Sequence, residues 1–141
     1  MTDPFDLERF VRAQDPVFRD VQGELARGRK QTHWMWFVFP QIAGLGRSPM
    51  AQRYALRDEV EARSYLVHPV LGARLVECTE AMLGWAGRKS AEAILGPIDA
   101  MKFKSSMTLF DAVSSEPGNA FARALAALCH GERDPLTLER L

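Results

Sequence analysis

The segment from Leu71 to Trp85 carries the feature that most constrains the fold of this chain, a long helical stripe. Leu71, Leu75, Cys78, Met82 and Trp85 are separated by four, three, four and three residues. In an α-helix this spacing places all five side chains on one face, whereas a strand would divide them between two faces. The stripe therefore predicts a helix whose apolar face is buried in a core.

Cap signals divide the rest of the chain into further helices. Residue pairs and single residues typical of helix starts are Asp3-Pro4, Asp15-Pro16, Ser48-Pro49, Asp58, Ser90, Asn119 and Asp134-Pro135, and Gly28, Gly96 and Gly131 are typical of helix ends. Strand signals are confined to Phe37–Phe39, where Pro40 disfavours helix, and to Arg53–Leu56. We expect an all-α fold, a single compact domain over residues 1–141 with about seven mostly short helices and at most a minor β-ribbon.

Charge and cysteine content exclude several classes of function. Lys plus Arg and Asp plus Glu both number 18, so the chain has no net field that would attract nucleic acid or an anionic membrane. The two cysteines and three histidines lie far from metal-ligand spacing. We therefore expect neither metal nor cofactor, no nucleic-acid or membrane partner, and a reduced cytoplasmic location.

The first candidate site residues lie in the segment Thr32–Phe37. Here Thr32 is a candidate cap of a short helix, and two tryptophans, Trp34 and Trp36, accompany His33. One interpretation is a stacking wall for a base with a titratable histidine beside it. The alternative is a core helix whose indole N–H groups bind carbonyl oxygens.

A second candidate lies directly downstream, in a loop that leads into a helix. Gly44 and Gly46 permit close backbone approach, and Arg47 precedes Ser48, the expected N-cap. Such a loop suits a phosphate group. The alternative is a tight connector with a capped helix. The nearby basic residues Arg27, Arg29 and Lys30 are expected in a solvated loop.

The third candidate is the helix predicted from Asp99 to Val113. A projection at about 100° per residue places Lys104, Thr108 and Asp111 on the solvent side. Polar residues on the arc expected to be buried are Asp99, Lys102, Ser105 and Ser106. A lysine there must pair with an acid, extend to solvent or line a polar cleft. The alternative is local: Asp99 caps the helix, Lys102 reaches solvent from the first turn, and Ser106 bonds to the carbonyl oxygen four residues earlier.

Four segments carry a resemblance to a known family. They are His33–Gln41, Gly44–Ser48, Tyr65–Gly72 and Met101–Phe110, and they resemble a bacterial family of unknown function whose members are sometimes labelled calpastatin. The resemblance covers nearly the whole chain and implies a helical domain without an assigned activity. Thr32-His33-Trp34 is more distantly similar to the NADAR proteins, N-glycosidases acting on ADP-ribose-related substrates.

These observations lead to a functional hypothesis. A nucleotide or ADP-ribose-like ligand would stack on Trp34 and Trp36, place phosphate on Gly44, Gly46, Arg47 and Ser48, and meet a polar wall of Lys102, Ser105 and Ser106. Hydrolysis of an N-glycosidic bond would use Asp99 or His33 as the acid–base group. The alternative is a non-catalytic protein-interaction module in which the same aromatic residues form core or a binding surface.

Overall fold

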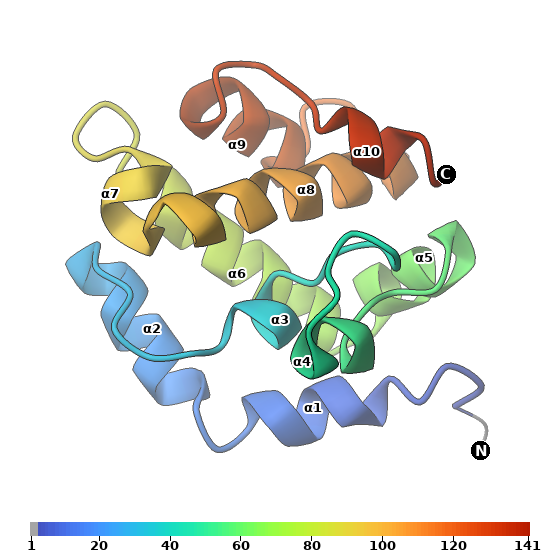
Figure 1. Ribbon diagram of the computed structural model, residues 1–141. Coiled ribbons are helices and arrows are strands. Elements are labelled where there is room, and N and C mark those ends of the chain that lie inside the picture. Colours follow the sequence, from blue (N-terminus) through green and yellow to red (C-terminus); the bar gives the residue numbers. More distant parts are fainter. Residues whose placement is uncertain (1–2) are drawn as a thin grey trace.

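Two long helices, α6 and α8, organise the computed structural model, which describes residues 3–141 (Figure 1). Helix α6 contacts α2, α3, α5 and α9, while α8 contacts α5, α7, α9 and α10. The first two residues of the predicted domain lie outside the described part. The ten helices found within it are α1 (Glu8–Gln14), α2 (Phe18–Arg27), α3 (Met35–Val38), α4 (Pro49–Arg53), α5 (Glu59–Val67), α6 (Leu71–Leu83), α7 (Ala91–Leu95), α8 (Pro97–Val113), α9 (Ala120–Leu128) and α10 (Pro135–Leu138).

The predicted stripe on α6 is buried. Leu71, Leu75, Cys78 and Met82 are all enclosed in the core, and the Trp85 indole Nε1 donates to the carbonyl oxygen of Leu25 at 2.9 Å. The stripe therefore joins α6 to α2, and the all-α class is confirmed. The helices described number ten rather than about seven, and four of them, α3, α4, α7 and α10, have only four or five residues each.

Four of the predicted caps at helix starts are confirmed by hydrogen bonds. The side chains of Ser48, Asp58, Ser90 and Asn119 each accept a hydrogen bond from the backbone N–H three residues later. Gly28 ends α2 with a φ of 68°, which favours glycine. Thr32 does not cap α3, because its hydroxyl donates to Glu24 Oε2. The starts predicted at Asp3-Pro4 and Asp15-Pro16 are also wrong, since α1 begins at Glu8 and α2 at Phe18, both without a side-chain cap.

The strand expectation for Phe37–Phe39 is wrong. Phe37 and Val38 belong to α3, and the residue that Pro40 keeps out of helical geometry is Phe39 alone, with φ −122° and ψ 72°. Arg53 likewise ends α4, and only Leu56 pairs with Ile42, in an isolated parallel bridge. Within residues 3–141, the structure contains no β-strand beyond this single bridge.

Helix α8 begins two residues earlier than predicted, at Pro97, directly after Gly96. Ser105 and Ser106 are buried, as the projection requires, but Ile98 is exposed because it belongs to the first turn. Thr108, expected on the solvent side, is also buried, because the segment leading into α10 covers it and the Asp134 N–H donates to its Oγ1. The start of α10 thus packs against the middle of α8, at Ser105 and Thr108.

Candidate functional site

Three charged side chains meet at the start of α8. Lys30 Nζ lies 3.0 Å from Asp99 Oδ2, and Lys102 Nζ lies 3.7 Å from Asp99 Oδ1. We call Lys30, Asp99 and Lys102 the Asp99 cluster. Two ammonium groups share one carboxylate, so the cluster carries one surplus positive charge.

Lys30 is the more tightly held of the two lysines, and the expectation that it lies in a solvated loop is wrong. Its side chain is only 7% exposed, its backbone N–H donates to Ile94 O at 2.8 Å, and its ammonium stands 5.1 Å from the centre of a Trp34 ring. Burial makes a paired ammonium costly to separate from its acid. Asp99 therefore has a structural partner in Lys30, which leaves Lys102 as the available cation.

The two tryptophans have different positions relative to this cluster. A ring of Trp36, which is half-buried, lies 5.3 Å from the Lys102 ammonium. Trp34 is 1% exposed and its indole Nε1 donates to Glu24 Oε1 at 3.0 Å, so it presents no face on which a base could stack. His33, which precedes Trp34 in the chain, is exposed to solvent. Of this segment, only Trp36 is placed beside a predicted polar residue of α8.

Glu24 organises the segment around Trp34. Its carboxylate accepts hydrogen bonds from the N–H groups of Gln31 and Thr32, the Thr32 hydroxyl and the Trp34 indole. Burial raises the pKa of Glu24, but these four donors outweigh that effect and lower it to about 2. Glu24 therefore stays ionised and fixes the approach of residues 30–34 to α8. Its position inside the apolar stripe of α2 was the available sequence signal, and it was missed.

A cavity of about 330 Å³ opens next to Lys102, and we call it the α8 cavity. Gly46, Lys102 and Ser105 are the predicted residues that the structure brings together there. The cavity is lined by the 41–46 loop, the first half of α8 and the start of α10, through Gln41, Leu45, Gly46, Ile98, Met101, Lys102, Lys104, Ser105, Asp134 and Leu136.

The other predicted residues of this loop, Gly44, Arg47 and Ser48, do not line the α8 cavity. Ser48 caps α4, and Arg47 is exposed outside the cavity lining. Gly44, with a φ of 98°, is covered by the Arg140 guanidinium so closely that a Cβ would overlap it. The close approach expected at this glycine is therefore made by a side chain of the same protein.

Asp134 is the cavity residue that sequence reasoning overlooked, because an Asp-Pro pair indicates only a helix start. Its Oδ2 accepts hydrogen bonds from Ser105 Oγ at 2.7 Å and Thr137 Oγ1 at 2.6 Å. Burial raises the pKa of Asp134, but the hydroxyl donors outweigh it and the net shift is downward. An ionised carboxylate thus lines the same cavity as Lys102 and Lys104.

Ser106 lies apart from this cavity and is fully buried, and its Oγ has no hydrogen-bond partner among the described residues. An unpaired buried hydroxyl is unfavourable, and alanine is also the better helix former. We expect Ser106→Ala to raise the free energy of unfolding by about 1 kcal/mol, as measured by urea denaturation. A loss of stability would mean that the hydroxyl has a partner in solution.

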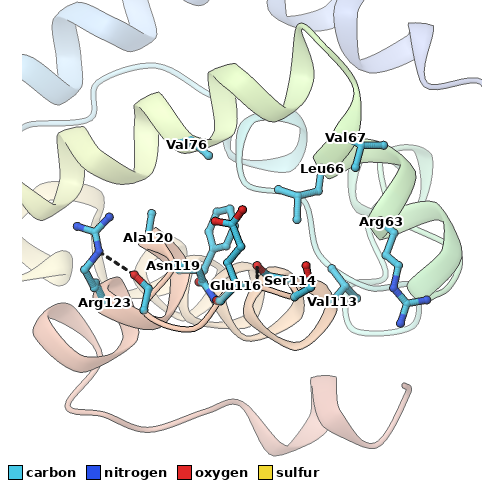
Figure 2. Close-up of a pocket in the computed structure, with 13 residues that line it drawn as sticks. Arg63, Leu66, Val67, Val76, Val113, Ser114, Glu116, Asn119, Ala120 and Arg123 are labelled. Atoms are coloured by element: carbon cyan, nitrogen blue, oxygen red, sulfur yellow. Dashed lines mark hydrogen bonds between the residues drawn. The ribbon is translucent and has the colours of Figure 1, made fainter.

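A second and larger cavity, of about 640 Å³, lies between α5, α6 and α9 (Figure 2). Its lining contains none of the candidate site residues predicted from the sequence. Within residues 3–141, no group of three or more His, Cys, Asp or Glu side chains is arranged to hold a metal ion. No helix in the same range has both the length and the apolar character to cross a membrane.

Comparison with known proteins places this helical chain in a family. Residues 4–141 match the model described as protein of unknown function (DUF1810), and the chain belongs to that family. The crystal structure of the conserved hypothetical protein Rv1873 from Mycobacterium tuberculosis is similar, with 49% identity and a TM-score of 0.94. The alignment covers 99% of this chain and 98% of that one. No curated protein matches.

These matches support the resemblance to a family of unknown function. They give no support to the calpastatin label or to the NADAR similarity. The protein thus belongs to a helical family to which no function is assigned.

Proposed function

We propose that this protein binds a small anionic ligand with a ring-bearing body, of the nucleotide type, in the α8 cavity. The observation that carries the proposal is the surplus charge of the Asp99 cluster. Lys30 satisfies Asp99 at 3.0 Å, and Lys102, the second lysine, also lines the cavity. A volume of about 330 Å³ is at the small end of the range for ligand pockets.

The side chains that line the α8 cavity suit both the anionic end and the ring of such a ligand. Lys102 and Lys104 supply ammonium groups for a phosphate or carboxylate, and Gln41 adds an amide that both donates and accepts. Ile98, Met101 and Leu136 are exposed apolar side chains at the same cavity, suited to the face of a ring. The anion would lie on the lysines and the ring against these apolar side chains.

Hydrolysis of an N-glycosidic bond is the finer part of the proposal. Water would add to the anomeric carbon while the C–N bond breaks and the base leaves with a proton. Asp134 is better placed for this step than Asp99 or His33, because its carboxylate lines the cavity and its lowered pKa keeps it ionised. It could orient water or stabilise positive charge developing on the sugar.

A reduced, cytoplasmic setting is also part of the proposal. Cys78 and Cys129 are both free and both buried. They behave as small apolar core residues, as expected where disulfides are not formed.

The test is Lys102→Met, which keeps most of the bulk and removes the charge. We expect affinity for ADP-ribose to fall about ten- to hundredfold, the range of a charged hydrogen bond. Stability should stay within about 0.5 kcal/mol of the parent, because Asp99 keeps Lys30. Trp36, beside Lys102, provides a fluorescence signal for the titration.

Arg12→Met is the matched control, because Arg12 is exposed on α1. It should leave ADP-ribose affinity unchanged, and adenosine, which lacks the phosphates, should bind weakly to all three proteins. Absence of ADP-ribose binding, or binding that Lys102→Met does not alter, would reject the proposal. In that case the exposed Ile98, Met101 and Leu136 would favour a protein-interaction surface.

A further inference from the structure

The larger cavity provides a second site with a different character. We call it the α5–α9 cavity; it is bounded by Leu66, Val67, Val76, Val113 and Phe121, with the Ser114–Asn119 loop along one side. Its volume of about 640 Å³ falls within the range of small-molecule sites. Because it shares no residue with the α8 cavity, an inference about it is independent of the function proposed above.

The floor of this cavity is apolar. Phe121 and Val113 are core residues, and Leu66 is half-buried beside them. Val76 and Val67 remain exposed on α6 and α5. A ligand in the cavity would therefore remove apolar surface from water, which favours binding of an alkyl chain or a ring.

Two arginines border the cavity, and both already have acidic partners. Arg123 forms a two-point contact with Glu80, with nitrogen–oxygen distances of 3.1 and 3.2 Å. Arg63 lies 3.4 Å from Glu59, one helical turn away. Their charges are offset within the protein, so neither leaves a surplus positive charge at the cavity.

Glu116 differs from the arginines, because its carboxylate has no ion-pair partner within residues 3–141. Its backbone is nevertheless fixed on both sides. The Glu116 N–H donates to Ser114 Oγ at 3.3 Å, and its carbonyl oxygen accepts from Asn119 Nδ2 at 2.8 Å. Asn119 in turn caps α9 and donates to Asp111. Figure 2 shows the Glu116 side chain extending from this loop toward α6, over the apolar floor.

We propose that the α5–α9 cavity binds a small organic cation, a primary ammonium or guanidinium group attached to an apolar chain or ring. The cation would pair with the Glu116 carboxylate, and the apolar part would cover Leu66, Val76 and Phe121. The surplus charge at this cavity is negative, so an apolar cation gains both attraction and burial there. An apolar anion of the same size would be repelled by Glu116.

The experiment compares hexylammonium with hexanoate, two probes of equal chain length and opposite charge. Binding to the full chain is followed through the amide NMR signals of Gly118 and Asn119, which border the cavity. Hexylammonium should shift these signals saturably and hexanoate should not. Glu116→Gln, at an exposed loop position, should weaken hexylammonium binding about two- to fivefold, the range of an exposed ion pair.

Two further variants separate the outcomes. Glu132→Gln changes another exposed glutamate outside the cavity and should leave the affinity unaltered. Arg63→Met should preserve or strengthen hexylammonium binding, because it removes a like charge. Binding of hexanoate that Arg63→Met abolishes would overturn the proposal in favour of an anion site. An absence of binding by both probes at millimolar concentration would also overturn it.

Discussion

Glu24→Ala should lower the free energy of unfolding by about 4 kcal/mol, the sum expected when several donors around a buried carboxylate lose their acceptor. Glu24 is 2% exposed and accepts four hydrogen bonds. Water can reach the donors of Gln31 and Thr32 in the variant, but the buried indole of Trp34 would stay unpaired. Urea denaturation measures the loss.

The matched control for this variant is Glu77→Ala. Glu77 is an exposed glutamate on α6 with a single hydrogen bond, from Gln22 Nε2. Its removal should cost no more than about 0.5 kcal/mol, as for other surface residues. Equal losses for the two variants would show that the hydrogen bonds around Glu24 contribute little to stability.

The pH dependence of stability gives an independent measure of the same carboxylate. Its pKa of about 2 in the folded protein lies below the ordinary value of 4.5, so folding favours the ionised form. That contribution, about 3 kcal/mol at 1.36 kcal/mol per pKa unit, is fully present above pH 4.5. It is lost as the pH falls through about 2. The parent should therefore lose more stability than Glu24→Gln between these two pH values, as measured by thermal denaturation.

Gly72→Ala should be the most disruptive single-methyl change in α6, with a loss of more than about 3 kcal/mol or a failure to fold. A Cβ at Gly72 would overlap the carbonyl oxygen of Leu66 and lie 2.9 Å from its carbonyl carbon. These are backbone atoms at the end of α5, so no side-chain rotation can relieve the overlap. The turn between α5 and α6 would have to open.

Gly84→Ala is the control, because it adds the same methyl group at the other end of α6. The backbone there has a φ of −58° and ψ of −21°, and the nearest atom to a Cβ is Ala81 O at 3.4 Å. Alanine fits this conformation and should be neutral or stabilising by up to about 1 kcal/mol. Circular dichroism and urea denaturation of both variants test the contrast. Similar losses would contradict the close packing at Gly72.

The helices could be predicted from the sequence because their signals are local. Capping by Ser90 and Asn119 and the stripe on α6 depend on residues within a few turns, and the structure confirms them. The short helix α3 was predicted less well, because Pro40 restricts only the residue before it. Thr32 was assigned as a cap since the sequence does not show that Glu24, eight residues earlier, takes its hydroxyl.

The candidate site was only partly predictable because charges pair across the chain. The projection of α8 placed Lys102 and Ser105 among the polar residues on the arc expected to be buried, and both line the α8 cavity. Lys30 pairs with Asp99 from about 70 residues earlier in the chain, and Asp134 bonds to Ser105 from 29 residues later. The packing of the glycines was unpredictable for the same reason. Nothing in the sequence distinguishes Gly72 from Gly84, and only the contact of Gly72 with the backbone of Leu66 sets them apart.

The burial of both cysteines has a practical consequence for labelling. Burial raises the pKa of Cys78 to about 12 and that of Cys129 to about 11, so both thiols stay protonated near neutral pH. Because maleimides and iodoacetamides react with the thiolate, neither residue should compete with an accessible cysteine. A single cysteine introduced at the exposed Val67 could therefore carry a spectroscopic probe to the edge of the α5–α9 cavity without removal of the native pair.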